Sequence, residues 1–61
     1  MTYRLIAIKT FGEEHIQDEG HNPQEVFAAH HRIARNPAVI KRIELRDHEG
    51  PIEAIWDKDW T

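Results

Sequence analysis

Two prolines near the middle of the chain, Pro23 and Pro37, bracket the one segment that can form a helix. Asn22 is a preferred N-cap residue, Pro23 suits the first helical position, and Glu25 can complete a capping box. Pro37 stops the helix because the residue before a proline is pushed out of helical geometry. The apolar residues of this segment share one side: Val26, Phe27, Ala29, Ile33 and Ala34. We therefore predict one amphipathic helix over residues 23–35.

The rest of the chain offers three strand-like segments, one before the helix and two after it. Residues 2–11 carry apolar side chains at both odd and even positions. Residues 39–47 alternate between apolar and charged side chains, and residues 52–57 follow after a turn at 48–51. Residues 12–22 contain two glycines and four acids. We predict a long acidic loop there, and we expect residues 13–21 to be the least ordered internal segment or to become ordered only on binding.

These elements predict a single small α+β domain with the order β-α-β-β, in which the helix packs on a three-stranded sheet. The helix makes a crossover between the first two strands, so these strands should run parallel. We prefer the strand order 1-3-2, which gives Trp56 a central position, and the alternative is 1-2-3. Several apolar side chains have an expected face: Tyr3, Leu5, Ala7 and Phe11 share one face of the first strand, and Val39, Ile43 and Leu45 point inward from the second.

The first strand is an edge strand in both of these orders, although it is apolar on both faces. Leu5 and Ala7 oppose Ile6 and Ile8, and one helix can cover only one face. A bare apolar edge is an aggregation hazard that native proteins cover. We therefore expect a homodimer whose interface includes the first strand, either through edge-to-edge pairing of two first strands or through two sheets packed face to face with Trp60 at the rim.

Size and cysteine content limit how this domain can be stabilised and where it is found. The chain has 61 residues and no cysteine, so neither a disulfide nor a thiolate metal site can stabilise it. The absence of cysteine fits a reducing compartment, and we expect a cytoplasmic location. No apolar run approaches the roughly 18 residues of a membrane span, and the N-terminus lacks the form of a signal peptide. We expect no membrane partner.

Acidic and basic residues are unevenly distributed along the chain, whose formal net charge is −3. Residues 10–31 hold five acids and no lysine or arginine, whereas residues 32–46 hold five bases and one acid. The acids before the helix are expected to face a basic protein partner: Glu13, Glu14, Asp18 and Glu19. The bases suggest an alternative, a nucleic-acid-binding regulator: Arg32, Arg35, Lys41, Arg42 and Arg46. We do not favour it, because these bases divide between two surfaces.

Five histidines invite a metal-binding interpretation. His30 and His31 are adjacent in the helix and diverge by about 100°, so they cannot hold one ion together. A flexible loop could wrap an ion with four of its side chains: His15, Asp18, Glu19 and His21. A metal-responsive module is therefore a second alternative, although no known ligand spacing matches. His30 projects into the apolar stripe of the helix, either as a neutral core histidine or as part of an interface.

Catalytic chemistry has little support in this sequence. There is no serine or cysteine to act as a nucleophile, and the three glycines are isolated rather than grouped in a phosphate-binding loop. We expect no enzymatic activity and no cofactor. The favoured function is a protein-interaction module that inhibits or regulates a larger protein. Genes of this length often encode inhibitors or accessory proteins of phages and mobile elements, and we expect this kind of role.

Overall fold

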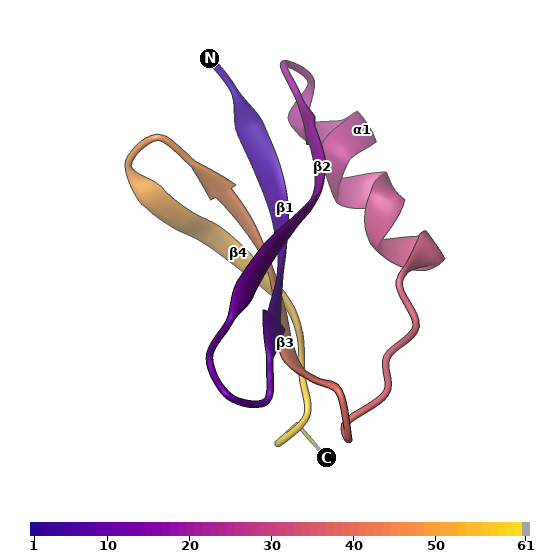
Figure 1. Cartoon of the computed structure of the whole chain (residues 1–61). Helices are drawn as coiled ribbons and strands as arrows, with labels where there is room; N and C mark the ends of the chain where they lie inside the picture. Colours follow the sequence, from indigo (N-terminus) through magenta and orange to yellow (C-terminus); the bar gives the residue numbers. More distant parts are fainter. Residues whose placement is uncertain (61) are drawn as a thin grey trace.

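A computed structural model describes residues 1–60 of the chain as a four-stranded antiparallel sheet with one short helix on one face (Figure 1). The order of the strands across the sheet is β2-β1-β3-β4. The elements, in chain order, are β1 (Tyr3–Lys9), β2 (Glu14–Gly20), α1 (Pro23–Ala28), the 3-10 turn η1 (Ala29–Arg32), β3 (Ile40–Asp47) and β4 (Gly50–Asp57). The α+β class is confirmed, but the sheet has one strand more than the sequence predicts.

The additional strand is β2, which occupies most of the predicted acidic loop. It forms a hairpin with β1, in which Tyr3 pairs with Gly20 and Ile8 with Glu14. Gly12 turns this hairpin with a φ of 92°, a conformation that favours glycine. The prediction of a loop over residues 12–22 is wrong. An exposed edge strand is held mainly by backbone hydrogen bonds to its neighbour and can consist largely of polar residues. The composition of β2 therefore resembles that of a loop.

The β1–β2 hairpin also changes the topology. It reverses the chain before the helix, so β1 and β3 run antiparallel instead of parallel. For the three predicted strands the preferred order 1-3-2 is wrong, and the alternative 1-2-3 is right, without its parallel pair. The first strand is not an edge, because β2 pairs with its outer side. Its two apolar faces are those of a central strand.

The helix begins as predicted but ends early. The Asn22 side chain accepts a hydrogen bond from the Gln24 backbone N–H (3.0 Å), and Pro23 takes the first helical position. The α-helix ends at Ala28, η1 adds one tighter turn, and Ile33 is already extended. The predicted end at residue 35 is wrong. From η1 the chain runs along the sheet to reach β3 (Figure 1), and extended residues cover this distance better than helical ones.

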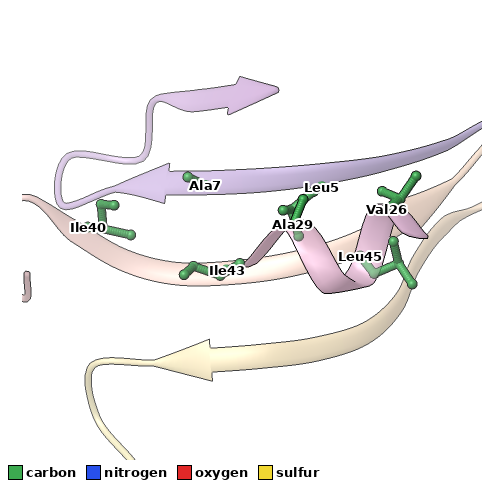
Figure 2. Close-up of a cluster of buried hydrophobic side chains, with 7 residues drawn as sticks. All are labelled: Leu5, Ala7, Val26, Ala29, Ile40, Ile43 and Leu45. Carbon is green, nitrogen blue, oxygen red and sulfur yellow. The ribbon is translucent and has the colours of Figure 1, made fainter. Parts of the chain in front are cut away.

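The core lies between the helix and one face of the sheet. Figure 2 shows its seven buried side chains: Leu5, Ala7, Val26, Ala29, Ile40, Ile43 and Leu45. The helix packs mainly over β1 and β2, where Gly20 lies close to the Val26 side chain. Trp56, expected at the centre of the sheet, lies half-buried on the edge strand β4. No helix within residues 1–60 is long and apolar enough to cross a membrane.

Candidate binding surfaces

The second face of the sheet, which α1 does not cover, carries an ion-pair network. Its centre is Glu44, which is buried and accepts hydrogen bonds from Arg42 Nε (2.8 Å) and Arg46 Nε (2.7 Å). The same two arginines reach outward to neighbouring strands. Arg46 donates to both carboxylate oxygens of Glu14 on β2 (2.8 and 2.7 Å), and Arg42 donates to Asp57 on β4 (2.7 Å). The network therefore spans the sheet from β2 to β4.

The arginines keep the three carboxylates of the network ionised. Burial alone would raise the pKa of Glu44, but its hydrogen bonds from Arg42 and Arg46 outweigh burial and hold this pKa below its usual value. The hydrogen bond from Arg46 lowers the pKa of Glu14. The backbone N–H of Asp59, followed by Arg42, lowers the pKa of Asp57. The three carboxylates are deprotonated and are paired with arginines. This arrangement suits a structural role better than proton transfer.

The network covers the apolar residues that were expected to form a dimer interface. Ile6 and Ile8 lie on the same face of the sheet as Glu44, and only 5% and 8% of their surface is exposed. Leu5 and Ala7 are fully buried under the helix. In residues 1–60, β1 is also paired on both sides, so this strand has no unpaired edge. The two features that led us to expect an interface through β1, an unpaired edge and an uncovered apolar face, are therefore absent from residues 1–60, and the homodimer itself stays a prediction.

His30 is a buried core histidine, one of the two interpretations that the sequence left open. Its Nδ1 lies 2.8 Å from Arg35 Nη2, and because arginine can only donate, Nδ1 is the acceptor. The ring meets Phe27 edge-on and lies beside His31. Burial, followed by the nearby charges of His31 and Arg35, lowers the pKa of His30. The ring is therefore neutral and part of the packing.

The four acids expected to face a basic partner do not form one free surface. Glu14 is bound to Arg46, and Glu19 accepts a hydrogen bond from Arg4 Nε (2.6 Å). Asp18 is half-buried, whereas Glu13 is exposed and lies 3.4 Å from His15. Two of the four carboxylates are therefore already used within the molecule.

The proposed metal ligands also lie apart. Three of them belong to β2, whose pairing with β1 holds it extended and prevents it from wrapping an ion. His21 follows the strand, and its Nδ1 lies 3.0 Å from the Met1 carbonyl oxygen. Among residues 1–60, no three histidine, aspartate or glutamate side chains are grouped so that they could hold one ion.

The two edges of the sheet are β2 and β4, and both are irregular. On β2 the register shifts by one residue at Gln17, between the pairs Leu5–Asp18 and Ile6–Ile16. On β4 the register shifts twice, at Ile55 and Ile52, and Pro51 lacks a backbone donor. Bulges, proline and charged side chains are the devices by which native proteins discourage strand addition at an edge. These edges are poor templates for a partner strand.

Two hollows open on the surface. The larger, about 520 Å³, lies over Ile6 and Ile16 on the network face, with Arg4, Glu14 and Arg46 in its wall. Arg4, Glu14 and Arg46 are engaged in ion pairs, and the β3–β4 turn completes the wall with Asp47, His48 and Glu49. The smaller hollow, about 300 Å³, lies between α1 and β4 and is lined mainly by Pro23, Phe27 and Leu45.

One end of the sheet exposes large apolar side chains. We call Phe11, Val39 and Trp60 the apolar end; their exposed fractions are 100%, 44% and 55%. The Thr10 N–H donates to the Val39 carbonyl (3.1 Å), which ties the β1–β2 turn to the approach to β3. The Lys58 N–H donates to the Lys41 carbonyl (2.9 Å), which ties the C-terminal segment to the same region. Figure 1 shows these three segments at one end of the sheet, away from the helix start.

Sequence reasoning found only Trp60 among these three residues. Phe11 and Val39 were placed on apolar faces of predicted strands, but both lie beyond the strand ends. The arginines of the network were visible in the sequence as the alternation Arg42-Ile43-Glu44-Leu45-Arg46, in which three ionic side chains share one face of a strand. This pattern predicted a charged face on the strand, although the preferred strand order placed that strand at an edge of the sheet.

No protein-family model, no curated protein and no solved structure matches this chain.

Proposed function

We propose that this protein is a non-enzymatic interaction module that acts by binding a larger protein, as an inhibitor or regulator. The observation that carries the proposal is the apolar end. Phe11, Val39 and Trp60 are exposed together at one end of the sheet. Single exposed apolar residues are ordinary, but a group of them marks a surface that another molecule covers.

Much of the remaining surface is already used by contacts within the molecule, although Met1, Ile16 and Ile52 are also exposed. The network face is crossed by ion pairs between Glu14, Arg46, Glu44, Arg42 and Asp57. The opposite face is occupied by the helix over β1 and β2. The sheet edges carry bulges. Burial of the apolar end against a partner would gain about 25 cal/mol per Å² of apolar area.

Nucleic-acid binding has weaker support. Arg42 and Arg46, two of the five bases assigned to that alternative, are held by carboxylates of the network. An arginine that already neutralises a glutamate releases few counterions when it meets a phosphate. Arg35 contacts the His30 ring and Arg32 is exposed. These bases do not form one positive surface.

Self-association stays a prediction, but its original reason has gone because β1 is a covered central strand. A homodimer would have to form without an unpaired edge on β1. Light scattering at tens of micromolar gives the mass directly, and a dimer mass would support self-association. A monomer mass would leave binding of a different protein as the remaining form of the proposal.

Affinity capture tests the proposed function. The tagged chain, incubated with a lysate of the source cells, should retain one protein in constant ratio, before and after nuclease treatment. The purified partner should then bind in calorimetry with a saturable, fixed stoichiometry. Loss of the partner on nuclease treatment would contradict protein binding, as would the absence of any retained protein.

A further inference from the structure

All three lysines of the chain lie at the apolar end. The chain contains only Lys9, Lys41 and Lys58. Lys9 ends β1, where it pairs with Ile40, and Lys41 is the next residue of β3. Lys58 follows β4, and its N–H donates to the Lys41 carbonyl (2.9 Å). Three segments far apart in the sequence thus bring every lysine to the end that exposes Phe11, Val39 and Trp60.

These lysines differ from the arginines in how they are used. Arg4, Arg42 and Arg46 each bind a carboxylate of this molecule. Within residues 1–60, none of the three lysines lies within ion-pair distance of a carboxylate. Their charges are therefore available to a partner, and the long lysine side chain can follow an apolar contact outward to reach an acid.

We propose that the apolar end, with Lys9, Lys41 and Lys58 around it, docks an acidic, amphipathic segment of a partner protein. Apolar side chains of that segment pack on Phe11, Val39 and Trp60, while flanking aspartates and glutamates meet the lysines. This inference rests on the proposed function and adds the chemistry of the partner. Interfaces of this kind combine an apolar centre with a charged rim that sets orientation and partner choice.

A second copy of the chain fits this surface poorly. A two-fold contact between two apolar ends would bring three lysines against three lysines, and like charges across an interface disfavour association. The acidic side chains of β2 could meet the lysines of another copy. That contact joins different surfaces and continues as an open chain instead of closing into a dimer. A different protein can present acids to the lysines and form a complex that does not continue as an open chain.

Nucleic acid and anionic membranes also fit less well. The chain has eleven acids against eight lysines and arginines, and Glu13 and Asp59 lie in the same turns as the lysines. These carboxylates repel phosphates, whether in nucleic acid or in lipid headgroups. A protein segment tolerates the two acids because it can present a base or a backbone N–H to them.

Charge reversal provides the test. The triple variant K9E/K41E/K58E and the single variant Phe11→Ser are compared with two matched controls. Arg32→Glu reverses a charge on an exposed arginine away from this end, and Ile52→Ser removes a half-exposed apolar side chain at the opposite end of β4. The probes are short fluorescein-labelled peptides of Leu and Phe with Asp and Glu, the same peptides with Lys replacing the acids, and acidic peptides without apolar residues.

The acidic apolar peptide should bind the wild type best, and its amide NMR shifts should map to residues 9–13, 38–41 and 57–60. The triple variant should lose about tenfold in affinity and gain preference for the basic peptide, whereas both controls should bind like the wild type. Melting curves check that each variant is folded. If the triple variant is unfolded, the peptide affinity of Phe11→Ser tests the proposal instead. Unchanged affinity in folded variants would overturn the proposal, as would tighter binding of oligothymidine or phosphatidylserine vesicles.

The outcomes also separate this inference from the proposed function. If lysate capture gives a protein partner whose binding is unaffected by Phe11→Ser and by the lysine reversals, the docking proposal is wrong and the binding function stands. If no protein is captured, both are wrong.

Discussion

Glu44 is the residue on which the network face depends most. It is buried, with 6% of its surface exposed, and two arginines donate to it from either side. A buried carboxylate of this kind contributes little net stability when paired, but its removal leaves two arginines close together without their shared anion. The residue thus fixes the positions of both arginines and, through them, the contacts to β2 and β4.

Glu44→Gln should lower the free energy of unfolding by about 2–3 kcal/mol. The amide can accept one arginine but not neutralise two. The matched control is Glu19→Gln, which breaks the half-exposed pair with Arg4 and should cost less than about 0.5 kcal/mol. Urea unfolding followed by circular dichroism measures both. Equal effects at the two positions would show that the network contributes no more than a surface ion pair.

His30 makes stability depend on pH in a range where the network does not. Its pKa is lowered from 6.5 in the folded protein, so the unfolded chain binds a proton more readily. Stability is therefore full above pH 6.5 and falls as the pH drops through the folded value. The network carboxylates have pKa values held below 4.5 for Glu14 and Glu44 and below 3.8 for Asp57, so their contribution is lost only in stronger acid.

The melting temperature of the wild type should therefore fall in two separate stages on acidification. His30→Gln should remove the first stage and keep the second, because glutamine can still accept from Arg35 but does not titrate. Thermal melts across the pH range measure this. A first stage of unchanged size in His30→Gln would assign it to a different histidine.

At the scale of elements, local signals predicted the structure where one stretch of sequence was enough. The cap at Asn22 and Pro23 fixed the start of α1, and the alternation from Arg42 to Arg46 located β3. The start of β4 was missed by two residues. The helix cap and the alternation in β3 depend on neighbours in sequence, and both form as predicted.

The elements that depend on distant partners were misjudged. β2 carries few apolar residues, and only its pairing with β1 makes it a strand. If β2 is interpreted as a loop, β1 becomes an edge strand, and its two apolar faces then predict a dimer. A strand that is apolar on both faces is better interpreted as central. The sequence pattern does not predict the bulges of β2 and β4, and the protection that they give to the sheet edges could therefore not be predicted either.

β2 should behave in solution as a formed strand. Its amides that pair with β1 should exchange with deuterium more slowly than those of residues 33–37, which follow η1 outside any helix or strand. Native-state hydrogen exchange followed by NMR measures this. Exchange across residues 14–20 as fast as in that connection would mean that the segment is a loop after all.

At the scale of the molecule, the residues divide between those that hold the domain together and those that remain available. The helix covers one face, the ion-pair network crosses the other, and the bulged edges resist strand addition. Of the predicted interface residues, only Trp60 remains exposed in the structure. The sequence could not reveal its neighbours, because Phe11, Val39 and the three lysines come together only through the turns of the folded sheet.

The most direct measurement compares binding with stability in the variant F11S/W60S. Both side chains are exposed in the isolated domain, so their removal should leave the melting temperature within about 2 °C of the wild type. The affinity for the captured partner, measured by calorimetry, should fall at least about tenfold, since aromatic anchors dominate interfaces. Unchanged affinity, or a melting temperature that falls with it, would contradict the assignment of the apolar end as the binding surface.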